Sequence, residues 1–97
     1  MKIEARIQEL GYTLPAPPMP VATYVGAVTV GGGKLVFVSG HGPKLADQDD
    51  ISGKVDSEVS IERAQEAARR VGLNMLATLR AEIGDLGRVE VARVGQV

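Results

Sequence analysis

A short apolar run that ends abruptly at glycine and proline does most to limit how this chain can fold. Residues 35–38 read Leu-Val-Phe-Val, and this β-branched and aromatic composition predicts a strand covered on both faces. Residues 40–43 contain two glycines and a proline, which end the pairing because glycine permits unusual backbone and proline has no N–H for a ladder. Ser39 and His41 therefore lie where the strand ends, a place that commonly carries function on a rigid scaffold.

The segment before this run predicts the other half of a hairpin. Residues 24–30 alternate loosely in hydrophobicity, and residues 31–34 (Gly-Gly-Gly-Lys) join them to the next strand. A phosphate-binding loop would need Ser or Thr after the lysine and a helix after that. Leu35 and a strand follow instead, so an antiparallel hairpin is favoured.

Residues 60–83 carry the strongest helical pattern of the chain. Ser60 suits an N-cap, Glu62 favours the helix dipole, and Gly84 suits a C-cap. One continuous apolar stripe is expected from Ile61, Ala64, Ala68, Val71, Met75, Leu79 and Ile83. Four arginines (Arg63, Arg69, Arg70 and Arg80) mostly fall off the stripe, as on a solvated face with ion pairs. The helix should be roughly 35 Å long, enough to cross a sheet.

The two ends of the chain complete the expected elements. Residues 3–10 predict a short helix that stops at Gly11, and the proline-rich residues 14–20 predict an extended arm. Residues 88–94 alternate as a half-buried strand. A hairpin, one long helix and a last strand leave one sheet face bare and one edge unprotected. We therefore expect either that other subunits cover this face or that part of the domain is missing.

Composition narrows the class of protein. The chain has 97 residues, so a single domain over residues 1–97 is expected. The net charge is −1 without a basic stripe, unlike a nucleic-acid binder, and the absence of cysteine excludes disulfides and thiolate chemistry. Neither a signal peptide nor the ~18 apolar residues of a membrane span is found. A soluble cytoplasmic protein is expected, with no nucleic-acid or membrane partner.

An acidic segment invites a metal-site interpretation that its details do not support. Asp47, Asp49 and Glu58 have the spacing of positions 1, 3 and 12 of a calcium loop. Positions 5 and 6 are Ile51 and Ser52, where such a loop needs an oxygen ligand and a glycine. A solvated acidic loop without metal is favoured.

His41 permits two interpretations. It is either a turn histidine that is exposed or hydrogen-bonded to the backbone, or a pocket-lining group near Tyr24 and Ser39. A serine–histidine hydrolase pair is disfavoured because no Gly-x-Ser-x-Gly elbow surrounds Ser39.

Motifs spread along the whole chain resemble the RidA family, also called YjgF or L-PSP endoribonuclease-like, in its branch with a proline-rich N-terminal arm. The segments that carry the resemblance are residues 10–18, 21–25, 35–43, 53–55, 67–69, 73–77 and 83–89. One string is fairly specific: Phe-Val-Ser-Gly followed by a polar residue, a glycine or apolar residue, and then Pro, when a Tyr precedes the hairpin and an Asn lies mid-helix.

The resemblance implies an α+β, chorismate-mutase-like fold: a mixed sheet with a long helix packed on one face. It implies a homotrimer with small-molecule pockets between subunits. Archetypal members hydrolyse reactive enamines and imines, such as 2-aminoacrylate, to 2-keto acids and ammonia, without a metal or organic cofactor. Residues 1–97 would be the N-terminal portion of that fold, without its C-terminal helix and strands.

The family's site transfers to four positions. Tyr24 matches the tyrosine of the family's pocket motif, and Ser39 and Gly40 match the Ser-Gly that ends the central strand. His41 stands where glutamine is common. These four residues form the expected site for a small carboxylate-bearing metabolite, and no catalytic residue is assigned.

Two further family groups have no counterpart here. The arginine that binds the substrate carboxylate and the glutamate near the attacking water belong to a C-terminal half, and Arg88 and Arg93 are not at the motif position. Because a substrate carboxylate needs a fixed cation, we expect imine hydrolysis to be impaired. A non-catalytic, trimeric binding or regulatory module is the alternative. An endoribonuclease ranks last, because His41 is the only histidine and no basic patch would hold phosphates.

Overall fold

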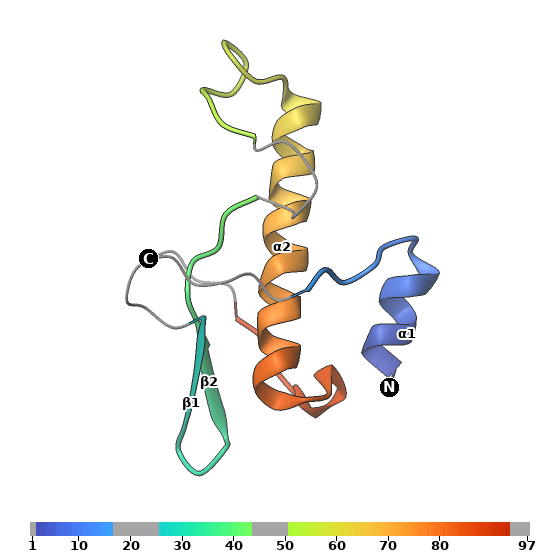
Figure 1. The fold of residues 1–97 in the computed structure, drawn as a ribbon, viewed down its shortest axis with the longest axis vertical. Coiled ribbons are helices and arrows are strands. Elements are labelled where there is room, and N and C mark those ends of the chain that lie inside the picture. Colours follow the sequence, from blue (N-terminus) through green and yellow to red (C-terminus); the bar gives the residue numbers. More distant parts are fainter. Residues whose placement is uncertain (1, 17–25, 44–50, 94–97) are drawn as a thin grey trace.

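The computed structural model describes residues 2–16, 26–43 and 51–93, and it has an α+β architecture (Figure 1). A long helix runs through the molecule, with a two-stranded antiparallel hairpin and a short helix on opposite sides of it in this view. The elements in chain order are α1 (Lys2–Glu9), β1 (Ala27–Val30), β2 (Leu35–Val38), α2 (Ile61–Ile83) and the 3-10 helix η1 (Leu86–Arg88).

The ends of α2 are set by the caps that the sequence predicts. The Ser60 hydroxyl accepts from the backbone N–H of Arg63 at 3.1 Å, which satisfies one of the first-turn donors. At the other end Gly84 has φ 85° and donates its N–H to the carbonyl of Arg80 at 2.7 Å. The predicted helix is confirmed, with Ser60 as its N-cap.

The hairpin is confirmed as well. Strands β1 and β2 pair with Val28 opposite Phe37 and Val30 opposite Leu35. The three glycines of the connection have φ between 65° and 88°, the left-handed region that glycine adopts without strain. Residues 24 and 25 of the predicted first strand lie outside the described residues.

One face of the hairpin packs on α2. Thr29 on β1 donates its hydroxyl to Glu82 Oε2 on α2 at 2.5 Å. Just before β1, Gly26 lies so close to the helix that a Cβ there would come within 2.8 Å of Thr78 Cγ2. A glycine is therefore needed for this approach of backbone to helix.

Strand β2 is not covered on both faces, contrary to the expectation. Leu35 is 51% exposed and Phe37 is 61% exposed, whereas Val36 and Val38 are half-buried. Side chains alternate between the two faces of a strand, and the helix that contacts the hairpin, α2, covers one of these faces. The other face of the described hairpin is bare, as the element count led us to expect.

The buried face of α2 differs from the predicted apolar stripe. Its buried residues are Arg70, Asn74, Ala77 and Thr78. The predicted stripe is mostly half-buried, and Ile61 at its start is 55% exposed. The hairpin, the segment after it and the N-terminal arm all approach the helix where its side chains are small or polar. The row of small and polar side chains is therefore buried more deeply than the apolar stripe, and at Thr78 the close approach of Gly26 accounts for it.

The start of the chain folds as predicted and is tied to its distant end. Helix α1 is followed by Gly11 at φ 87°. Glu4 on α1 accepts at Oε2 from the backbone N–H of Leu86, 82 residues away, at 3.2 Å. Leu86 is 1% exposed, which makes it the most buried apolar side chain of the described residues. Residues 14–16 of the proline arm are irregular, and 17–20 lie outside the described residues.

The last predicted strand is wrong. The chain forms η1 where this strand was expected to begin, and residues 89–93 have no regular structure. Asp85 caps η1 by accepting from the N–H of Gly87 at 2.8 Å. Alternation alone does not make a strand without a neighbour to pair with, and no described strand lies beside this segment. In the described part of the chain, no helix is both long and apolar enough to span a membrane.

Candidate functional site

The candidate site is the segment Ser39–Pro43, called the 39–43 loop below, which follows β2 and lies along α2. Ser39 extends the hairpin by one bond, since its N–H donates to the carbonyl of Gly26 at 2.9 Å. Ser39 and His41 are half-buried, and Gly40 is exposed. The polar residues therefore lie at the end of a rigid hairpin, as predicted.

The side chain of His41 is held at both ring nitrogens. Nδ1 lies 2.6 Å from the carbonyl oxygen of Ser39, and Nε2 lies 2.7 Å from Oγ1 of Thr78 on α2. These contacts match the interpretation of His41 as a turn histidine that is hydrogen-bonded to the backbone. The bond to Thr78 on α2 is an additional contact. The contact between Ser39 and His41 runs through a backbone carbonyl, and both nitrogens are engaged, so the ring is not placed as the base of a serine hydrolase.

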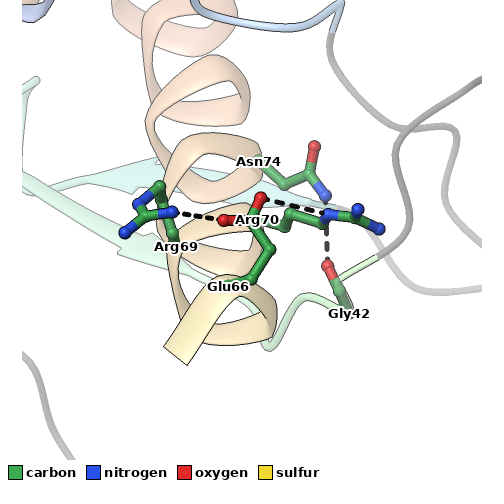
Figure 2. Close-up of polar contacts among 5 residues, drawn as sticks. All are labelled: Gly42, Glu66, Arg69, Arg70 and Asn74. Atoms are coloured by element: carbon green, nitrogen blue, oxygen red, sulfur yellow. Dashed lines mark hydrogen bonds and ion pairs between the residues drawn. The ribbon is translucent and has the colours of Figure 1, made fainter. Parts of the chain in front are cut away.

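A second bond joins the loop to α2 one turn earlier. Asn74 Nδ2 donates to the carbonyl of Gly42 at 3.1 Å, and Asn74 is 3% exposed (Figure 2). Asn74 and Thr78 are four residues apart, so they share a helix face. The helix thus anchors the loop at two adjacent residues, His41 and Gly42.

An ion-pair cluster continues this polar row toward the start of α2. Arg70 is 5% exposed and its Nε lies 3.5 Å from Oε1 of Glu66, which also pairs with Arg69 (Figure 2). Arg70 was expected on a solvated face and is buried instead. A buried arginine needs a partner because an uncompensated buried charge is costly, and Glu66 supplies one.

The row formed by Arg70, Asn74 and Thr78 was missed by the sequence reasoning. Three polar residues at steps of four were the available signal. That pattern is equally typical of a solvated helix face, and only the position of the 39–43 loop distinguishes the two.

Tyr24, the fourth predicted site residue, lies outside the described residues. A shallow hollow of about 230 Å³ lies elsewhere, between the arm and the second half of α2. It is lined by Leu14, Pro15, Ala77, Arg80, Ala81 and Gly84. None of these belongs to the 39–43 loop, so this hollow is separate from the candidate site.

The described residues contain no group of three or more His, Cys, Asp or Glu side chains placed to hold a metal ion. The acidic segment that begins at Asp47 lies outside the described residues as far as position 50.

Comparison with known proteins gives two clear similarities. Protein TCP17 of Trypanosoma cruzi is 33% identical over 89 residues, which are 92% of this chain and 54% of TCP17. The solved structure of Atu1372 from Agrobacterium tumefaciens, a protein of unknown function, superposes with a TM-score of 0.72. It is 36% identical, and the match covers 90% of this chain and 52% of Atu1372. No family model matches the chain.

In both similarities the match covers most of this chain and about half of the other protein. This chain spans about half the length of TCP17 and of Atu1372, and it shares its fold with part of Atu1372 over nine-tenths of its own residues. The arrangement of hairpin and long helix is therefore similar to part of the longer protein Atu1372, and the sequence is similar to about half of TCP17.

Proposed function

We propose that this chain is a RidA-like domain with the chorismate-mutase-like fold, and that its 39–43 loop binds small carboxylate-bearing metabolites. The observation that carries the proposal is the double anchoring of this loop on α2, through Asn74 to Gly42 and through Thr78 to His41. Binding groups need rigid support, and a loop held at two points on a long helix has it.

The orientation of the peptide group between Ser39 and Gly40 favours the binding of an anion at this loop. The peptide bonds of the described residues are trans, so the N–H of Gly40 points away from the Ser39 carbonyl that faces His41. Gly40 is exposed, and a backbone N–H is a good donor to a carboxylate oxygen. The substrate class of the resembling family, small keto and imino acids, carries such a carboxylate.

We expect the hydrolytic activity of this chain to be low. The one buried arginine among the described residues, Arg70, is paired with Glu66. The arginine and glutamate of the resembling family have no counterpart in residues 1–97. We therefore expect slow hydrolysis of enamines and imines, or ligand binding without hydrolysis, as in a regulatory module.

Assembly as a homotrimer is part of the same proposal. Val28, Val30, Leu35 and Phe37 lie on the outer face of the hairpin and are each at least 40% exposed. Fully burying such side chains is worth about 1.5–3 kcal/mol each. An apolar patch of this kind on a hairpin favours contact with another subunit.

The test uses the purified 97-residue chain. Light scattering gives its native mass, titration with pyruvate followed by NMR gives ligand binding, and ammonia release measures hydrolysis of 2-aminoacrylate generated in the assay. We expect a trimer that binds pyruvate and releases ammonia slowly. Family-like turnover would contradict the impaired activity, and absence of both binding and turnover would overturn the proposal.

A further inference from the structure

We propose that His41 and Thr78 are positioning residues, which together set the direction of the peptide group between Ser39 and Gly40. The part of this inference that concerns ligand affinity rests on the proposed function. The part that concerns the loop stands on the structure alone, and the experiments below separate the two.

The protonation of the imidazole follows from its two neighbours. A carbonyl oxygen only accepts hydrogen bonds, so at 2.6 Å from the Ser39 carbonyl Nδ1 must carry the proton. In the neutral ring Nε2 is then an acceptor, and the Thr78 hydroxyl at 2.7 Å donates to it. The structure thus assigns the Nδ1–H tautomer to His41.

Thr78 is held in the one orientation that this assignment needs. It is 8% exposed, and its methyl group lies against Gly26 while its hydroxyl reaches His41. Rotation about χ1 would move the methyl into a different contact and remove the donor. The side chain therefore connects the entry of β1 with the exit of β2.

His41 in turn determines which way the peptide after Ser39 points. The imidazole holds the Ser39 carbonyl toward itself, and the trans peptide turns the Gly40 N–H to the other side. Glycines at 40 and 42 give the backbone little resistance to a different orientation. Without the imidazole, the Ser39 carbonyl loses its bond from Nδ1, whereas the bond from Asn74 to Gly42 still joins the loop to α2.

The first experiment reads the tautomer directly by ¹⁵N NMR of the imidazole. The chain has a single histidine, so the spectrum is unambiguous. We expect the Nδ1–H form in mildly alkaline buffer, although the Nε2–H form prevails in free histidine. A mixture of tautomers like that of free histidine would overturn the inference, whatever the protein binds.

The second experiment follows the backbone amide signals of Gly40 and Gly42 in matched variants. Thr78→Val keeps the shape but removes the donor, whereas Thr78→Ser keeps the hydroxyl. We expect Thr78→Val to shift the amide signal of Gly40 and to give a mixture of His41 tautomers. Thr78→Ser should leave the amide signal and the tautomer close to those of wild type. Equal spectra for the two variants would contradict a positioning role.

A third variant tests rescue at the histidine itself. The side-chain amide of His41→Asn can place its N–H near the position of Nδ1 and donate to the Ser39 carbonyl, whereas His41→Ala cannot. We expect His41→Asn to restore the Gly40 amide signal and His41→Ala to lose it. Circular dichroism and thermal melting check that each variant is folded, and an unrestored signal in folded His41→Asn would argue against the inference.

Ligand affinity then links the loop to the proposed function. Loss of one hydrogen bond in this chain of contacts should weaken pyruvate binding by about three- to tenfold in Thr78→Val, and by less in Thr78→Ser. If wild type shows the Nδ1–H tautomer and the expected amide shifts but binds no pyruvate, the proposed function fails and the positioning role stands. If pyruvate binds equally to both variants, the loop direction does not serve the ligand.

Discussion

Asn74 shows most directly how one side chain holds the candidate site. It is 3% exposed, and its amide donates to the carbonyl of Gly42 at 3.1 Å. Removing a buried side chain that makes a hydrogen bond costs free energy, because the bond and the packing around the side chain are both lost. The position of the loop therefore depends on a residue in the middle of a helix.

Replacing this amide should weaken the whole domain. We expect Asn74→Ala to lower the free energy of unfolding by about 1–3 kcal/mol. Gln65→Ala, at an exposed position of the same helix, should change it by less than about 0.5 kcal/mol. Urea unfolding followed by circular dichroism measures both, and equal values would mean that the bond to Gly42 contributes little.

A second single residue, Glu4, joins the two ends of the chain. Its Oε2 accepts from the N–H of Leu86 and lies 3.7 Å from Nε of Arg80. We expect Glu4→Ala to cost about 1–3 kcal/mol of unfolding free energy, because the N–H of the buried residue Leu86 loses its acceptor.

The matched control lies on the same helix. Glu9 pairs with Arg6 at 3.3 Å, but both side chains are about two-thirds exposed. Solvent screens such a pair, so Glu9→Ala should have a much smaller effect. If the two variants unfold at the same urea concentration, the Glu4 contacts do not stabilise the fold.

Among the secondary-structure elements, two glycines should respond in opposite ways to replacement by alanine, one raising and one lowering the free energy of unfolding. Gly72 lies inside α2, and a Cβ there would meet no other atom within 4 Å. Alanine is the better helix former, so Gly72→Ala should raise the unfolding free energy by about 0.5–1 kcal/mol.

Gly26 should respond in the opposite direction. A Cβ there would lie 2.8 Å from Thr78 Cγ2, and Thr78 is held by its bond to His41. We expect Gly26→Ala to lower the unfolding free energy by about 1–3 kcal/mol, since the hairpin must move off the helix. Thermal melting of both variants is the measurement, and a shift of the same sign in both would contradict the packing described above.

For the whole molecule, the proposed trimer covers the outer face of the hairpin. Phe37 is 61% exposed at the centre of this face, and burial in a subunit interface would favour assembly. We predict that Phe37→Lys converts the proposed trimer to monomers and leaves the helix signal in circular dichroism unchanged.

A control outside the hairpin tests whether this effect is local. Leu10→Lys changes a side chain of similar exposure, 55%, at the end of α1. We expect its native mass in sedimentation equilibrium to equal that of wild type. Dissociation by both variants, or by neither, would mean that the hairpin face is not the interface.

The amino-acid sequence by itself determined the local elements of this protein. Ser60 and Gly84 mark the ends of α2, and the glycines at 31–33 mark the hairpin, because caps and tight turns depend on residues only a few positions apart. The site loop was predicted for the same reason, since the glycines and proline of residues 40–43 end β2.

Only the tertiary structure decided which surfaces meet. It buried the polar row of α2 more deeply than the apolar stripe, and it paired His41 with Thr78, 37 positions along the chain. It also turned the expected last strand into η1 and irregular chain, since no described strand lies beside it. Such choices depend on how closely backbones approach one another, which periodicity along a single segment does not encode.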